Sequence, residues 1–223
     1  MTVPRRFTTA IAPLLGMVLA AAAYGFAIGA GKSLLYAERS AVKFPLLLCG
    51  TGTLCAIGYA VIAAFLGVRL PLAAVLCTAF ALFRALAILL ASLAPVTLFL
   101  ALTMELPMAQ SLGGYPEFVG ANVAFVAAAG STALVFQSRR LLAEQGVPPR
   151  RAIVLVAGWL LMTLGVGGQL AFWLRPFFGI ASLTGEPPFL LGAEPTVTGA
   201  RNFYEVVWQL LRGADLPEGL RWR

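Results

Sequence analysis

The sequence contains no histidine, only three cysteines and few charged residues, and each shortage excludes a kind of chemistry. Without histidine the chain lacks the usual ligands of haem, zinc and copper sites and cannot form a histidine proton shuttle. Cys49, Cys55 and Cys77 lie in apolar runs without a CxxC pair, so we interpret them as small core residues. The sequence therefore predicts no metal and no cofactor other than bound lipids.

Acidic residues are missing from the long apolar runs, because every Asp and Glu falls in a predicted loop or tail. Ion-coupled transport commonly uses Asp, Glu or His inside the membrane, so this shortage argues against it. The sequence also lacks a GxSxG nucleophile elbow, and no carboxylate pair is placed to act as general acid and base. We predict no catalytic residue, and hence a protein that is not an enzyme.

What the chain has is apolar sequence: 60% of its 223 residues are hydrophobic and 11% are charged, against about 25% charged in soluble domains. A helix needs roughly 20 apolar residues to cross about 30 Å of hydrocarbon. The composition predicts an all-α, polytopic transmembrane helical bundle. The net charge of +7 comes from Lys and Arg in loops and tails, which favours contact with membrane lipids and not with nucleic acid.

Charge-free runs divide the chain into a transmembrane bundle over residues 1–175 and an extramembrane tail over 176–223. The first run resembles a signal peptide, but it continues to Gly31 and is too long for one, so we predict a retained span. Five spans are expected, at about 7–31, 44–67, 85–104, 118–137 and 152–174. The first two are predicted to be joined by a polar loop that contains Lys32, Glu38, Arg39 and Lys43.

Residues 72–104 are the ambiguous part, too long for one span and too short for two spans with a turn. Arg84 divides this run. We favour a short lead-in over 72–83 followed by span 85–104, which would place Arg84 near the membrane boundary. One long bent element over the whole run and a hairpin of two short helices are the alternatives, and the hairpin would move the tail to the other side of the membrane.

Basic residues predict the orientation, because they concentrate on the cytoplasmic side. With five spans, four basic residues share the side of the tail: Lys32, Arg39, Lys43 and Arg175. The side of the N-terminus has seven: Arg5, Arg6, Arg69, Arg139, Arg140, Arg150 and Arg151. We expect a cytoplasmic N-terminus and a periplasmic or extracellular tail.

The tail has five prolines but also one amphipathic segment. Asn202 can cap a helix over 203–211, which would lie at the membrane interface. Its apolar residues share one face at helical spacing: Phe203, Val206, Val207, Leu210 and Leu211.

Small residues recur on two predicted spans: Ala21, Gly25 and Gly29 on the first, Gly158 and Gly165 on the last. Such residues let helix backbones approach closely in lipid. Packing within this chain is the favoured interpretation, and contact with a partner subunit is the alternative.

Aromatic residues gather around the end of the last span and in the tail helix. We expect them to act as anchors at the membrane interface or as contacts for a partner. Three polar residues within apolar runs, Arg84, Asn122 and Gln169, could instead line a polar path. The aromatic block and its neighbours are Trp173, Arg175, Pro176, Phe177, Phe178, Phe203, Tyr204 and Trp208.

Four stretches, at 43–48, 92–95, 169–179 and 202–205, resemble a bacterial family of small multispanning membrane proteins. Its members are sometimes named after an actin-binding WASP-homology domain, and their hydropathy is loosely similar to that of Yip-family proteins. The similarity covers residues 43–211 and implies a multi-pass protein of the bacterial inner membrane. It transfers no catalytic or ligand residue, and we find no actin-binding motif after the tail helix.

Together these features favour a non-catalytic membrane subunit that packs against, stabilises or scaffolds other integral membrane subunits in a larger bacterial complex, for example an energy-transducing one. The alternative is a small transporter, channel or lipid-handling protein.

Overall fold

The computed structural model describes residues 5–103, 115–177, 189–190 and 199–211 of the chain. Within these residues every regular element is an α-helix, and five helices are long and apolar enough to cross a membrane. The predicted all-α bundle of five spans is therefore confirmed. The helices are α1 (Arg5–Ala30), α2 (Leu34–Phe65), α3 (Leu72–Thr103), α4 (Tyr115–Glu144), α5 (Pro149–Trp173) and α6 (Phe203–Leu211).

Helix α2 begins at Leu34, well before the predicted start of the second span at residue 44. Ser33 is its N-cap, and its Oγ accepts a hydrogen bond of 3.4 Å from the amide of Tyr36. The prediction of a polar loop up to Lys43 is wrong. Charged residues mark where hydrocarbon contact ends, but they are good helix formers, so the helix continues through them. For the same reason α4 extends past residue 137 to Glu144.

Helix α3 is one continuous helix, which agrees with the alternative of one long element and contradicts both the separate lead-in over 72–83 and the hairpin. Arg84 suggested a division of the run, but the backbone on both sides of it is helical. The 32 residues span about 48 Å, which exceeds the hydrocarbon thickness of about 30 Å. A helix of this length crosses once and extends beyond the hydrocarbon, because nothing requires it to end at the boundary.

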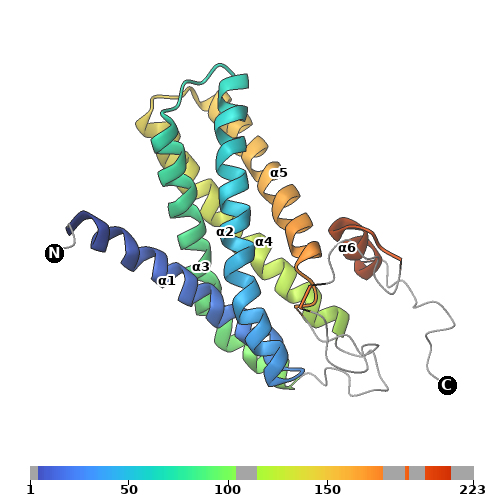
Figure 1. Ribbon diagram of the computed structural model, residues 1–223. Helices are drawn as coiled ribbons and strands as arrows, with labels where there is room; N and C mark the ends of the chain where they lie inside the picture. The colour runs from blue at the N-terminus through green and yellow to red at the C-terminus, as the bar shows by residue number, and fades with distance from the viewer. Residues whose placement is uncertain (1–4, 104–114, 178–188, 191–198, 212–223) are drawn as a thin grey trace.

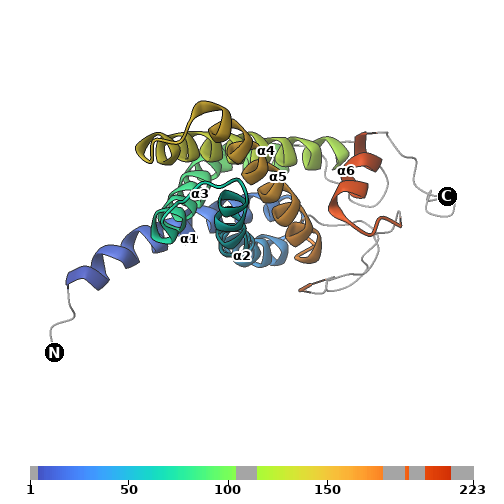
Figure 2. The ribbon, with the colours of Figure 1, turned by 90° about the horizontal axis from the view of Figure 1, so that it is seen from above.

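The helices pack as an unequal bundle. Helix α1 packs against both α2 and α3, α4 packs mainly on α3, and α5 packs mainly on α2 (Figure 1). The N-terminal half of α1 projects away from the other helices, and the view from above agrees (Figure 2). Helix α6 lies beside α5, and also contacts α4.

The core lies where α1, α2 and α3 meet. Tyr24 of α1 and Phe44 of α2 are buried there in an edge-to-face arrangement, with ring centroids 5.1 Å apart. The outward faces carry large exposed apolar residues, among them Ile153 and Leu161 of α5, which are 70% and 71% exposed. Such faces are typical of helices that contact lipid.

Candidate functional site

The small residues of α1 lie against α2. A Cβ atom on Gly25 would be 2.8 Å from the Cβ of Phe44, and one on Gly29 would be 2.6 Å from the amide nitrogen of Ala37. Ala21 is buried on the same helix. This part of the small-residue stripe is therefore occupied within the chain and is not open to a partner.

The small residues of α5 are less uniform. A Cβ on Gly158 would lie 3.3 Å from Ile62 of α2, so this glycine also serves packing within the chain. Gly165 has no heavy atom within 4 Å of the position of a Cβ. The two glycines therefore do not form one docking stripe.

Asn122 joins three helices. Its Oδ1 atom accepts a hydrogen bond of 2.9 Å from the hydroxyl of Tyr24 on α1 and one of 3.4 Å from the hydroxyl of Thr97 on α3. Its own amide donates to the carbonyl of Phe118 within α4 at 2.8 Å. Asn122 is 2% exposed, so this group acts as a polar contact that holds α1, α3 and α4 together.

A second polar group joins α2 to α5. The Tyr59 hydroxyl is hydrogen-bonded to that of Thr163, and the indole nitrogen of Trp159 donates to the Tyr59 carbonyl at 3.1 Å. The rings of Tyr59 and Trp159 stack with centroids 4.8 Å apart. The sequence gives no sign of the contacts of Tyr24, Tyr59 or Trp159, because an aromatic residue in an apolar run does not indicate its partner.

Lys43 is the most unexpected residue of the molecule, because it was predicted in a loop and is completely buried in α2. Its Nζ atom donates a 2.9 Å hydrogen bond to the carbonyl of Pro176, just after α5. One turn earlier, the hydroxyl of Ser40 donates to the carbonyl of Phe177 at 2.9 Å. Two side chains of α2 thus hold the chain segment that leaves α5.

Aromatic rings enclose the Lys43 ammonium group. The Nζ atom is 5.0 Å from the ring centroid of Phe189 and 5.9 Å from that of Phe177. Phe177 also contacts Phe44 edge to face, with centroids 6.1 Å apart. Within the described residues no carboxylate pairs with Lys43, so a carbonyl dipole and aromatic faces stabilise its charge.

The aromatic block after α5 is split between the inside and the outside of the fold. Phe177 is buried against α2, whereas Trp173 is 52% exposed. The guanidinium carbon of Arg175 lies 3.6 Å from the ring centroid of Phe172, and its Nε donates to the Phe172 carbonyl at 2.7 Å. Phe178 lies outside the described residues.

Helix α6 begins with a reciprocal cap. The amide of Glu205 donates to Oδ1 of Asn202 at 2.9 Å, and Asn202 Nδ2 donates to the Glu205 carboxylate at 2.6 Å. This carboxylate also accepts a 2.7 Å hydrogen bond from the amide of Arg201. The cap explains why so short a segment forms a helix at the predicted position.

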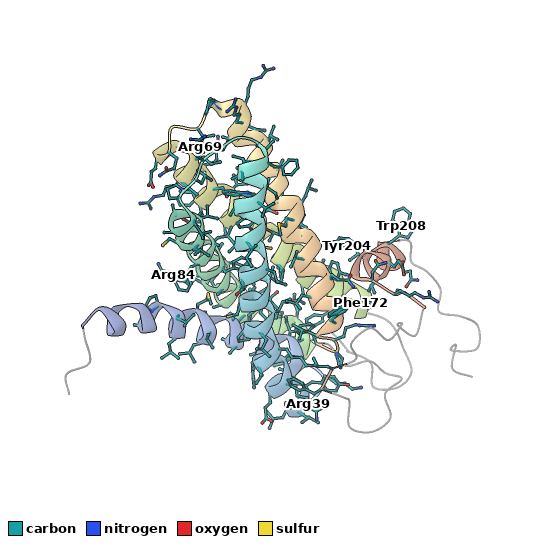
Figure 3. The ribbon with its side chains drawn as sticks, turned by 45° about the horizontal axis from the view of Figure 1, so that its top comes forward. Arg39, Arg69, Arg84, Phe172, Tyr204 and Trp208 are labelled. Carbon is teal, nitrogen blue, oxygen red and sulfur yellow. The ribbon has the colours of Figure 1, made fainter. Side chains whose placement is uncertain are left out.

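Two aromatic residues attach α6 to α5. The hydroxyl of Tyr204 donates to the carbonyl of Leu164 at 2.6 Å, and burial raises the pKa of this phenol. Gly168 provides space for the contact, since a Cβ there would lie 2.8 Å from Phe203. Trp208 points outward (Figure 3), and it is 55% exposed.

Contacts between α2 and α5 define the register of these antiparallel helices. A Cβ on Gly58 would meet the side chain of Met162, and Gly158 approaches Ile62 further along. The bond from Lys43 to the segment after α5 continues this series of contacts. Along the series the residue number rises on α2 as it falls by about the same amount on α5, as expected for antiparallel helices in one register.

This register aligns two charge-free stretches, residues 44–65 of α2 and 152–173 of α5. At about 1.5 Å per residue each is roughly 32 Å long, which matches one bilayer. The aligned runs define the part of the bundle that faces hydrocarbon. Basic residues flank both runs: Lys43, Arg69, Arg151 and Arg175.

Arg84 lies inside this part of the bundle. The neighbouring residue Phe83 packs on α2, where a Cβ on Gly52 would be 3.0 Å from its ring. Gly52 belongs to the charge-free run of α2, so Arg84 is not at the predicted boundary position. Its side chain is exposed on the outer face of α3 (Figure 3). Phe80 and Ile88, one turn away on either side, are also exposed.

The three polar residues predicted to share a path are not brought together. Asn122 is buried with Tyr24 and Thr97, whereas Arg84 faces outward from α3. Gln169 is half-buried on α5. Within the described residues no contact joins any two of the three.

Within the same residues there is also no group of three or more His, Cys, Asp or Glu side chains that could hold a metal ion. No family model, no curated protein and no solved structure matches this chain.

Proposed function

We propose that this chain is a non-catalytic subunit that packs against and stabilises other integral membrane proteins in a bacterial inner-membrane complex, with its N-terminus in the cytoplasm. An energy-transducing complex is one setting that fits a subunit of this kind. The resemblance to the bacterial multispanning family stays a prediction that is consistent with this function.

The observation that carries the proposal is the projecting half of α1 (Figures 1 and 2). Its C-terminal half is packed tightly on α2, but Leu15 in the projecting half and Leu19 just past the middle of the helix are 54% and 60% exposed. A Cβ on Gly16 would meet no atom within 4 Å. A long apolar helix that leaves its own bundle, with a small residue between large ones, is suited to pack on a neighbouring membrane protein.

Purification from native membranes in a mild detergent tests the proposal. The tagged chain should co-purify with a membrane protein at a fixed stoichiometry, measured by mass spectrometry and light scattering. A Gly16→Trp variant should lower recovery of that protein about tenfold, because bulk at a close helix contact prevents packing. The matched control is Leu161→Trp on the exposed face of α5, which should leave recovery unchanged. A monodisperse single chain would contradict the proposal.

The alternative function, a transporter or channel, has less support. It requires polar side chains that converge on one path, and Arg84, Asn122 and Gln169 are separated on three helices. A lipid-handling function makes no such demand, and lipid transfer between vesicles by the purified chain alone would favour it over the subunit function.

A further inference from the structure

The outward position of Arg84 places a positive charge against hydrocarbon, which is unfavourable in free energy, and no carboxylate among the described residues pairs with it. Arg84 is level with Gly52 of α2, because the adjacent Phe83 packs on that glycine. From there the nearer end of the charge-free stretch of α2, at residue 44, is about 12 Å away along the helix, and the other end, at Phe65, is about 20 Å away. The guanidinium therefore starts deep in the hydrocarbon region.

Snorkelling does not remove the cost. An arginine side chain extends toward the headgroups while its stem lies along apolar surface, but about 12 Å of depth is more than its full length. A charge that faces hydrocarbon is unfavourable, and such residues normally pair within a protein interior. Within the described residues Arg84 has no such pair.

A carboxylate of this chain cannot provide the pair at that depth. All nine acidic residues lie outside the charge-free runs of the five spans. Glu38 precedes the run of α2, and Glu144 ends α4. A second copy of the chain has the same runs and the same shortage. The missing charge must therefore come from a different molecule.

We propose that Arg84 forms an ion pair inside the membrane with an Asp or Glu side chain on a transmembrane helix of a partner protein. The proposal rests on the subunit function and gives the chemistry of its partner. Phe80 and Ile88, 37% and 54% exposed, flank Arg84 at the four-residue spacing that a packed helix contacts. Arg84 also lies on the side toward which α1 projects, so α1 and α3 can contact the same partner (Figure 3).

A photo-reactive amino acid placed at Phe80 or at Ile88 tests which molecule lies there. We expect crosslinks to one membrane protein, within a helix that carries Asp or Glu at the depth of Arg84. The same amino acid at Leu161, on the exposed face of α5, is the control and should not reach that helix. Crosslinks to lipid alone, or to a helix without a carboxylate, would overturn the proposal.

Charge exchange tests the pair itself. Arg84→Gln and Arg84→Glu should each weaken the complex at least about thirtyfold, whereas Arg84→Lys should keep most of the affinity. Changing the carboxylate of the partner to Arg should restore binding of the Arg84→Glu chain. Gel filtration of each variant alone, with an unchanged profile, shows that it folds.

The outcomes separate the two proposals. If the wild-type chain retains its partner and Arg84→Gln retains it equally well, the ion pair is wrong while the subunit function stands. If the wild-type chain has no protein partner, both are wrong.

Discussion

Lys43 in α2 and Pro176 after α5 are joined by a 2.9 Å hydrogen bond from Nζ to the backbone carbonyl, although 133 residues separate them in the chain. The contact lies where the charge-free runs of both helices end, so a buried lysine connects the edge of the core to the start of the tail. This position makes Lys43 part of the packing of the fold and not a surface anchor.

Lys43→Ala should destabilise the protein by about 2–4 kcal/mol, since it leaves a cavity and an unpaired carbonyl. Thermal unfolding in detergent should show a melting temperature lower by at least about 5 °C. Lys43→Met, which fills the space without the donor, should have a smaller effect. Lys32→Ala, at an exposed lysine, is the control and should change stability by less than about 0.5 kcal/mol. Equal losses of stability in Lys43→Ala and Lys32→Ala would contradict the assignment of Lys43 to the packing of the fold.

Gly25→Ala and Gly29→Ala should each separate α1 from α2, because the added methyl group meets backbone atoms that cannot move away. We expect losses of about 2–3 kcal/mol, as for other overpacked sites. Gly16→Ala provides the comparison on the same helix, and it should be neutral or slightly stabilising. The free energy of unfolding in detergent is measured for all three variants. If Gly16→Ala is the most destabilising, the close contact of α1 with α2 at Gly25 and Gly29 is wrong.

Tyr24 and Asn122 should show energetic coupling. Tyr24→Phe removes the hydroxyl donor and Asn122→Ala removes the acceptor. The double variant should therefore lose less stability than the sum of the losses of the two single variants. Hydrogen bonds between membrane helices contribute about 0.6 kcal/mol on average and up to about 1.7. A double-mutant cycle measured by unfolding gives the coupling, and additive losses would show that the bond contributes nothing.

Gly168→Val should release α6 from α5, because the larger side chain would occupy the place of the Phe203 ring. Spin labels at positions 161 and 208 report the distance between the helices, and their distance distribution should broaden in this variant. Gly165→Val, at a glycine without neighbours within 4 Å, should leave the distribution narrow. The attachment is not as inferred if both variants behave alike.

Arg84→Leu should stabilise the isolated chain in a bilayer, because an apolar side chain replaces a charge that faces hydrocarbon. The expected gain in insertion free energy is about 2.5–3.5 kcal/mol. Insertion and unfolding of the full chain in a bilayer, with Arg84 or Leu at this position, measure it. A loss of stability on this change would indicate that Arg84 contacts its own chain.

The elements that depend on local composition could be predicted from the sequence. Charge-free apolar runs required five helices, and Asn202 marked the beginning of α6 at the correct residue. The errors concern where helices end: charges at Glu38 and at Arg84 were interpreted as breaks, although both lie within helices. A charge limits contact with hydrocarbon, but it does not interrupt backbone hydrogen bonds.

The candidate site depended far more on tertiary contacts. Small residues on α1 indicated close helix approach, but only packing showed that α2 occupies the stripe and leaves Gly16 open. The depth of Arg84 followed from the contact between Phe83 and Gly52, which joins two helices and leaves no trace in the local pattern.

Hydropathy thus determines how many helices cross the membrane, because each apolar run is solvated independently by lipid. Register, depth and pairing arise from contacts between runs far apart in the chain, such as the bond from Lys43 to Pro176. Those contacts decide which polar residues are enclosed by the fold and which, like Arg84, face outward. The number of spans was therefore readable from local composition, and the place of each charge was set by how the spans pack together.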